Sequence, residues 1–244
     1  TSAYQDVKRL TADADKSVSE AAYTAMQSIV TPAQFADVCA MLNSADAANA
    51  ASLQKAAANA IASENGSKQY ELAQKAMTAS QKQQLYYPLL AQSGTREAIT
   101  TLLQQKNDAA DAALLQLDNS EMLPVLIAMV HDNPALKEKA LARYLQLARK
   151  AGATAEERSL LLTGGLLESP TAALAAQYVS ALGQTRTIQA LAAVAPYIDK
   201  EATAAAAAEA VKEIVGHNAA ANGGADARTL LEKARKYYES KRAE

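Results

Sequence analysis

The sequence predicts an all-α protein, and three features of its composition lead to that prediction. Half of the 244 residues are hydrophobic but only 5% are aromatic, so most of the apolar surface is aliphatic. Alanine (59 residues) and leucine (28 residues) are abundant, and both stand at the top of the helix-propensity scale. Glycine (9) and proline (6) are scarce, and the runs of β-branched residues that favour strands are nearly absent. A sheet-based fold is therefore excluded.

Residues 120–151 give the clearest helical pattern. Their first half places Leu123, Leu126, Ile127 and Val130 at positions i, i+3, i+4 and i+7, which form one apolar stripe on a helix. Asn133 followed by Pro134 is typical of a helix start. The second helix then buries one face, made of Leu136, Ala140, Leu141, Tyr144, Leu145 and Ala148. Each helix is short, so both must bury their stripes against neighbours.

The same two-helix pattern recurs along the chain. Signals for the first helix of each pair lie at or near Thr31, Glu64, Thr95, Ser120, Thr154 and Thr185, spaced by 25 to 34 residues. Second helices are expected to begin near Asp46, Gln81, Asp108, Asn133, Ser169 and Lys200. A capping motif at Ser17 predicts a further helix that ends near Val30, as the second helix of a terminal pair. The expected pairs are residues 1–30, 31–63, 64–94, 95–119, 120–152, 153–184 and 185–217, followed by a linker at 218–224 and a polar capping helix at 225–244.

Glycines are expected to mark breaks between these helices. Gly94 and Gly183 each precede a Thr-Arg pair, which predicts that they end a helix in the left-handed conformation. Gly164 and Gly165 lack the spacing of a phosphate-binding loop. They interrupt an apolar helical stretch and are therefore expected to mark a break in it.

The segment SEMLPVLIAMVHDNPALKEKALARYLQLA, residues 120–148, resembles a HEAT repeat. The matching features are Leu123-Pro124 early in the first helix, Asp132 in the turn, and Leu136-Lys137 with a run of alanine in the second helix. A second unit with Asp199 in the turn is similar. The resemblance implies a right-handed α-α superhelix of the HEAT or armadillo type, with about six to seven helix pairs, and a role in binding other proteins.

Charge and cysteine content exclude several functions. The net charge of −2 offers no field that would attract nucleic acid or an anionic membrane. The longest strongly apolar run, Leu123 to Val130, is too short to span a bilayer, for which about 20 residues are needed. The single cysteine, Cys39, cannot form an intramolecular disulfide and is expected to be a buried thiol. Because the chain begins at Thr1 and stops within a charged helical segment, we expect it to be part of a longer polypeptide.

Residue types that carry catalysis are few and scattered. The two histidines, His131 and His217, are each expected at the C-terminal end of a helix, where the helix dipole favours them. The acidic pair Glu156-Glu157 follows Thr154 and is interpreted as part of a helix cap. We therefore expect no catalytic residue, no cofactor site and no metal site in this chain.

The function predicted from these features is that of a non-catalytic helical-repeat scaffold. Its partner is expected to be a protein or an adjacent domain of the same polypeptide, with no nucleic acid, membrane span or small-molecule ligand. The expected contact residues lie on the solvent side of second helices and alternate in charge: Lys139, Arg143, Glu209, Lys212 and Glu213. The alternative interpretation of these charges is that they only keep an alanine-rich protein in solution.

A second resemblance gives a different hypothesis for the parent protein. The alanine-rich texture and the LGQT-type junction near Gly183 are similar to HEAT-like regions that precede sugar-hydrolase-like domains in secreted bacterial carbohydrate-active proteins. This resemblance implies a platform or spacer whose catalytic domain lies outside this chain, in a periplasmic or extracellular location.

Overall fold

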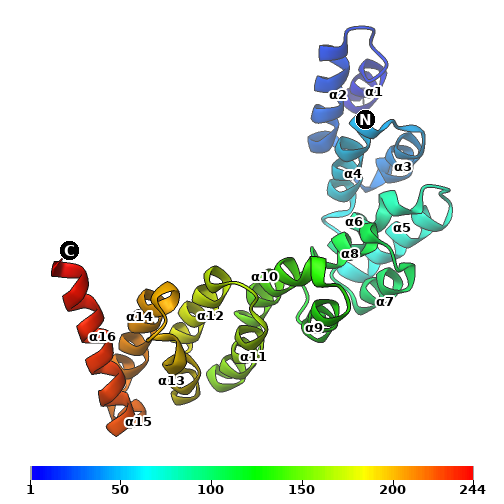
Figure 1. The fold of residues 1–244 in the computed structure, drawn as a ribbon. Coiled ribbons are helices and arrows are strands. Elements are labelled where there is room, and N and C mark those ends of the chain that lie inside the picture. Colours follow the sequence, from blue (N-terminus) through cyan, green and yellow to red (C-terminus); the bar gives the residue numbers. More distant parts are fainter. Residues whose placement is uncertain (1, 244) are drawn as a thin grey trace. The chain divides into compact units, whose positions relative to one another are not determined.

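The computed structural model describes residues 2–243, and Thr1 and Glu244 lie outside the described range. Across residues 2–243 the chain forms sixteen α-helices and four short 3-10 helices, with no strand (Figure 1). The all-α prediction is confirmed. The chain divides into two compact units, Thr1–Asn119 and Ser120–Glu244, which are described separately.

Unit 1 contains eight α-helices. They are α1 (Ser2–Leu10), α2 (Lys16–Ile29), α3 (Phe35–Ser44), α4 (Ala47–Ile61), α5 (Gly66–Thr78), α6 (Tyr87–Gln92), α7 (Arg96–Gln105) and α8 (Asp108–Leu114). The 3-10 helices η1 (Pro32–Gln34) and η2 (Gln83–Tyr86) lead into α3 and α6. Consecutive helices pack as the pairs α1–α2, α3–α4, α5–α6 and α7–α8, and α2, α4, α6 and α8 also pack in succession. The odd-numbered helices therefore form a first layer and the even-numbered helices a second layer (Figure 1).

Unit 2 repeats this two-layer arrangement. Its helices are α9 (Met122–Asp132), α10 (Lys137–Ala148), α11 (Ala155–Glu168), α12 (Ala172–Thr185), α13 (Ile188–Val194), α14 (Glu201–His217), α15 (Ala219–Asn222) and α16 (Ala225–Ala243), with η3 (Pro134–Leu136) and η4 (Ala195–Tyr197). The first layer consists of α9, α11 and α13, and the second of α10, α12 and α14. Helix α16 packs against α14.

The core of unit 2 follows the apolar stripe predicted for residues 120–151. Leu126 on α9 and Leu141 on α10 are both fully buried. Tyr178 of α12 is also fully buried, and its hydroxyl donates a hydrogen bond of 2.7 Å to the carbonyl of Leu141. The buried stripes of α9, α10 and α12 thus form a continuous core between the layers.

Local caps explain where several helices begin. Thr154 Oγ1 accepts a hydrogen bond of 3.1 Å from the Glu157 N–H, and Glu157 in turn accepts one of 3.3 Å from the Thr154 N–H. This is the capping box predicted at Thr154. Thr95 and Asp46 cap α7 and α4 at the predicted positions.

Three predicted starts are displaced by two residues because a better acceptor lies nearby. The carboxylate of Asp15, rather than Ser17, caps α2 by accepting the Ser17 N–H at 2.8 Å. Thr171 caps α12, since the Ser169 hydroxyl donates instead to the Gly165 carbonyl of the preceding helix. Thr187 caps α13, since the Thr185 hydroxyl donates to the Leu182 carbonyl.

The prediction that glycines break helices holds for Gly94 and is wrong for three others. Gly94 has a φ of 63° and ends α6 as predicted. Gly183 lies inside α12, and the left-handed residue after that helix is Arg186, with a φ of 59°. A Cβ at Gly183 would stand 2.9 Å from the Cα and Cβ of Ala210 on α14. Glycine is therefore needed there for close helix packing.

Helix α11 runs unbroken through Gly164 and Gly165, and the same explanation applies to Gly165, whereas Gly164 has no atom closer than 3.9 Å to its would-be Cβ. A Cβ at Gly165 would stand 2.4 Å from the ring of Tyr178 on α12. Gly165 lets this buried tyrosine lie against α11. The expected break is therefore a packing site.

Residues 218–224, which were expected to be a linker, contain the four-residue helix α15. Asn222 within it is buried, and its amide donates to the carbonyls of Arg186 at 3.0 Å and Ile214 at 2.9 Å. These bonds hold the segment against α14 and against the residue that follows α12, before α16 begins.

Candidate interaction surface

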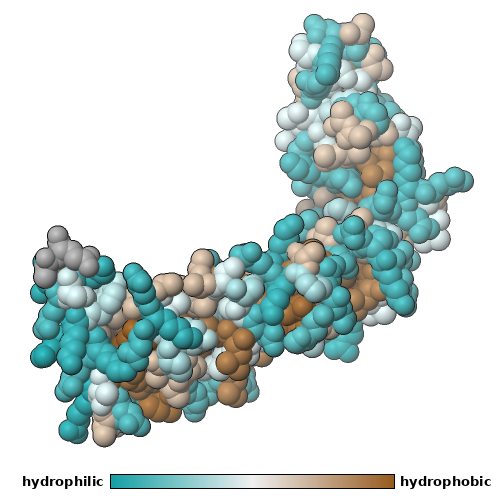
Figure 2. All heavy atoms as spheres, in the orientation of Figure 1, coloured by the Kyte–Doolittle hydropathy of each residue, from teal (hydrophilic) through white to brown (hydrophobic). Residues whose placement is uncertain are grey.

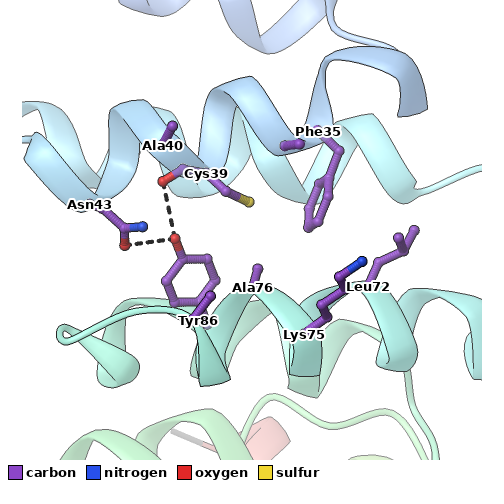
Figure 3. Close-up of a pocket in the computed structure, with 10 residues that line it drawn as sticks. Phe35, Cys39, Ala40, Asn43, Leu72, Lys75, Ala76 and Tyr86 are labelled. Atoms are coloured by element: carbon purple, nitrogen blue, oxygen red, sulfur yellow. Dashed lines mark hydrogen bonds between the residues drawn. The ribbon is translucent and has the colours of Figure 1, made fainter.

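A groove lies between α3 and α5 in the first layer of unit 1 (Figure 3). Its volume is about 310 Å³, and most of its lining is apolar. Phe35, Cys39 and Ala40 line it from α3, and Leu72 and Ala76 line it from α5. The small side chains of the two alanines leave the space between the helices open.

Tyr86 closes the floor of this α3–α5 groove and is fully buried. Its hydroxyl lies 3.1 Å from the Cys39 carbonyl and 2.8 Å from Asn43 Oδ1, both of which can accept its proton (Figure 3). The Ser80 hydroxyl donates to the same Asn43 oxygen at 2.6 Å. These bonds fix the floor, so the groove is pre-formed.

The polar groups of the groove do not form a catalytic set. Burial raises the pKa of the Cys39 thiol to about 12, although its hydrogen bond with Tyr86 acts in the opposite direction. The thiol therefore stays protonated near neutral pH and is a poor nucleophile. Burial likewise raises the pKa of Tyr86 to about 12. The groove can accept an apolar side chain, and the Lys75 ammonium is the one charged group among its lining residues.

Exposed apolar side chains are concentrated in the first layer of both units. In the described part of the chain, large apolar residues exposed to solvent are Leu10 on α1, Leu103 on α7, Leu160 and Leu167 on α11, and Ile188 on α13. Leu160 and Leu167 are the most exposed, at 65% and 76%. They lie seven residues apart on one face of α11, with Gly164 between them, and Figure 2 shows hydrophobic surface over this helix.

The second layer exposes polar and small residues instead. A groove between α12 and α14 is lined by Ser180, Gln184, Glu209 and Glu213. In unit 1, a groove across α4 and α6 is lined by Gln54, Lys55 and Gln92, with alanines between them. These surfaces suit hydrogen bonding in water and offer no apolar anchor.

The contact residues predicted on α14 are used by the chain itself. Glu209 accepts from Lys212 and from the Tyr238 hydroxyl of α16, each at 2.7 Å. These bonds hold the pKa of Glu209 below its usual value, with the Lys212 bond as the larger cause. Glu213 forms an ion pair with Arg186.

The two contact residues predicted on α10 differ in their surroundings. Lys139 is exposed, whereas Arg143 is partly buried and donates to Gln146 at 2.8 Å. Helix α12 packs between α10 and α14, so Lys139 and Arg143 do not meet the α14 residues. The predicted set therefore occupies two separate places in the second layer.

The remaining candidate residues also lie apart. His131 is near the end of α9, 3.9 Å from Glu168, and His217 is the last residue of α14. Among residues 2–243, no three side chains of the metal-binding types are grouped closely enough to hold an ion. No helix in this same range is long and apolar enough to cross a membrane.

No protein-family model matches the chain, and no curated protein matches it. The geometry of the chain itself therefore carries the functional argument.

Sequence reasoning missed the exposed leucines of α11. Residues 160–167 contain Leu160, Leu161, Leu162, Leu166 and Leu167, and a stripe at i and i+7 was present in this run. The pattern alone does not tell which of two leucine stripes faces the core. The structure assigns Leu162 and Leu166 to the core and Leu160 and Leu167 to solvent.

Proposed function

We propose that this chain is a non-catalytic helical-repeat scaffold that binds a partner protein, or a neighbouring domain of its own polypeptide, through the exposed face of its first layer. In this proposal the helix pairs are HEAT-like repeats in a right-handed α-α superhelix of about six to seven pairs, with the boundaries expected from the sequence and α16 as the capping helix.

The spacing of long-range hydrogen bonds supports the repeat architecture. Asn59 of α4 donates to the Gln27 carbonyl of α2, 32 residues away. Gln92 of α6 donates to the Ala58 carbonyl of α4, 34 residues away, and Tyr178 bonds to Leu141 across 37 residues. The separations of 32 and 34 residues fall within the expected spacing of 25 to 34 residues, and that of 37 is slightly longer. Such separations are expected if each helix pair is bonded to the next.

The exposure of Leu160 and Leu167 is the observation that carries the binding proposal. Burying a leucine side chain contributes roughly 1.5–3 kcal/mol, and α11 leaves two of them in water seven residues apart. Gly164 between them allows the backbone of a partner to approach closely, since the nearest atom to a Cβ there is the Tyr144 hydroxyl at 3.9 Å. Two adjacent apolar anchors around a small residue are typical of a site that receives another helix or loop.

Residues of the second layer have a secondary role in this proposal. Lys139 and Arg143 would contribute charge complementarity with a partner, which affects the association rate more than the affinity. The predicted contact residues on α14 would contribute only if a partner displaced the groups that already occupy them. Tyr238 would have to leave Glu209, and Arg186 would have to leave Glu213.

The test compares variants of the two layers. Three proteins are immobilised and exposed to an extract of the source cells. They are the wild type, the double variant Leu160→Gln, Leu167→Gln, and the double variant Lys139→Glu, Arg143→Glu. Proteins that are retained are identified, purified and titrated against each variant by calorimetry. We expect the double leucine variant to weaken binding by at least about 30-fold, because the loss of a single anchor of about 2 kcal/mol already lowers the affinity by that factor.

Both leucines are exposed, so the variant should fold as the wild type does, which circular dichroism checks. An affinity unchanged by the leucine substitutions but lost with the charge reversals would move the contact to the second layer. Unchanged affinity in both variants would remove both faces from the proposal.

A further inference from the structure

A second cavity, in unit 2, has a different chemistry from the α3–α5 groove. It measures about 290 Å³ and lies between the end of α10, the first half of α11 and the end of α12. Arg149 and Arg158 line it together with Gln184 and Thr185, above an apolar wall that includes Leu162 and Ala181. No acidic side chain lines it.

The two guanidinium groups have no partner among the described residues. Neither the Arg149 nor the Arg158 guanidinium makes a hydrogen bond or an ion pair within residues 2–243, although the backbone N–H of each residue donates to a carbonyl of its own helix or cap. Other arginines of unit 2 are paired, such as Arg186 with Glu213 and Arg235 with Glu239. Two like charges that line one cavity repel each other, and partial burial of Arg158 adds a desolvation cost. A bound anion would offset both costs.

The wall behind the arginines is held by a cluster of hydroxyl groups. The Ser159 hydroxyl of α11 lies 2.7 Å from the hydroxyl oxygens of both Thr185 and Thr187. Thr185 donates its own proton to the Leu182 carbonyl at 2.7 Å. The cluster fixes the end of α12 against α11, and the donors left for a ligand are the two guanidinium groups and the Gln184 amide.

We propose that this cavity binds a phosphate group, either free or carried on a phosphorylated side chain. Two guanidinium forks provide a charge of +2 and paired N–H donors that match the oxygens of a phosphate dianion. A carboxylate carries half that charge and would leave one arginine uncompensated. The nearby acidic residue Glu157 is already engaged with the N–H groups of Ala153 and Thr154. The second source, a phosphorylated partner, rests on the proposed scaffold function, whereas free phosphate does not.

The first experiment titrates the purified chain with inorganic phosphate at low salt and pH 7.5. Binding is measured by calorimetry and by the NMR signals of the arginine Nε–H groups. We expect saturable binding that shifts the Arg149 and Arg158 signals, and a loss of affinity of about tenfold or more in Arg149→Gln and in Arg158→Gln, since each removes charge-assisted hydrogen bonds. Arg235→Gln is the matched control, with the same change of charge elsewhere in unit 2, and should bind as the wild type does.

A further variant separates charge from geometry. Arg158→Lys keeps the charge but removes the planar fork, so we expect an affinity between those of wild type and Arg158→Gln. It also keeps the proposal testable if the glutamine variant fails to fold. Absence of saturable phosphate binding, an equal loss in Arg235→Gln, or acetate that binds as tightly as phosphate would each overturn the proposal.

A second experiment distinguishes the sources of the phosphate. Blocked phosphoserine and blocked serine are titrated in the same way. Binding of phosphoserine at least as tight as that of inorganic phosphate supports a phosphorylated side chain, and binding of inorganic phosphate alone supports the free ion. The Leu160→Gln, Leu167→Gln variant should keep its phosphate affinity, so failure of the scaffold proposal and failure of the phosphate site give different results.

Discussion

In unit 2, α11 and α12 lie side by side but expose different chemistry to solvent. The exposed side of α11 carries Leu160 and Leu167. The exposed side of α12 carries Gln177, Ser180 and Gln184. Both helices have fourteen residues, and both bury a leucine-containing stripe in the core, so the difference lies in the surface alone.

This difference shows that the fold does not require leucine at the exposed positions of α11. Glutamine is nearly as good a helix former as leucine, and polar residues at positions 160 and 167 would cost the fold little. Helix α12 of the second layer carries polar residues at its exposed positions, whereas α11 of the first layer carries leucine at two of them. The same contrast holds in unit 1, where α7 exposes Leu103 while α6 exposes Gln92. The exposed leucines therefore support the proposed contact through the first layer.

The comparison of α11 with α12 depends on the packing of the two layers. Substitution of Leu141 should give the largest change in stability among the tests of that packing. Leu141 lies on α10 and is fully buried. Leu141→Ala should lower the free energy of unfolding by about 2–5 kcal/mol, through lost burial and the cavity left behind. Lys139→Ala, two residues away on the exposed side, should stay within about 0.5 kcal/mol of wild type.

Both values come from urea denaturation followed by circular dichroism. Equal stability of the two variants would mean that the helical phase of α10 is wrong, and with it the assignment of the second layer.

Two glycines test the spacing of helices within the second layer, with a smaller effect. A methyl group at Gly183 would press on Ala210 of α14, so Gly183→Ala should destabilise the protein by about 1–3 kcal/mol. Gly216 lies in α14 with nothing within 4 Å of its would-be Cβ. Gly216→Ala should therefore stabilise by about 0.5–1 kcal/mol through helix propensity. If both substitutions stabilise the protein, α12 and α14 are not in close contact at Gly183.

These residues also show how much the sequence could predict. Caps such as Thr95 and Thr154 act within a few residues of themselves, so their positions could be predicted from local sequence. Gly183 owes its role to Ala210, which lies on another helix, and no local pattern reveals that contact. Local reasoning therefore predicted breaks where the structure has packing sites.

The same limit applied to the candidate sites. The alternation of charge on second helices was visible, but the sequence could not show that Tyr238 engages Glu209 from 29 residues away. Likewise, Arg149 directly follows α10 and Arg158 lies in α11, and the cavity that they share exists only after α10, α11 and α12 have packed.

Asp37 gives a pH-dependent test in the first layer. Lys8 of α1 donates to Asp37 of α3 at 2.6 Å, and Tyr4 donates to it at 2.7 Å. These bonds, chiefly that from Lys8, lower the pKa of Asp37 against the opposing effect of burial. A lowered folded-state pKa means that the stabilisation is present above the unfolded value of 3.8 and is lost as the pH falls through the folded value.

The carboxylate of Asp37 is 37% exposed, so the expected contribution is no more than about 1 kcal/mol after solvent screening. Asp37→Asn should be less stable than wild type at pH 6, and the gap should narrow below about pH 4. Urea denaturation at the two pH values measures both gaps. A gap that is constant with pH would mean that Asp37 is not ionically engaged by α1.

Glu209 gives the corresponding test in the second layer, with the smallest expected effect. The hydroxyl of Tyr238 donates to this carboxylate, and burial followed by that bond raises the pKa of Tyr238 to about 12. Tyr238→Phe removes one of the two hydrogen bonds to Glu209 but keeps the ring against α14. The pKa of Glu209 should therefore rise towards its usual value while remaining lowered by Lys212.

The measurement is an NMR titration of the Glu209 carboxyl group in both proteins. Because the carboxylate is 57% exposed, the stability should change by only a few tenths of a kcal/mol. An unchanged pKa would mean that α16 leaves Glu209 accessible, and Glu209 would then be available to a partner as the sequence predicted. A raised pKa would place Glu209 among the groups that the chain uses to hold its own last helix, which leaves the exposed leucines of α11 as the stronger candidate for binding.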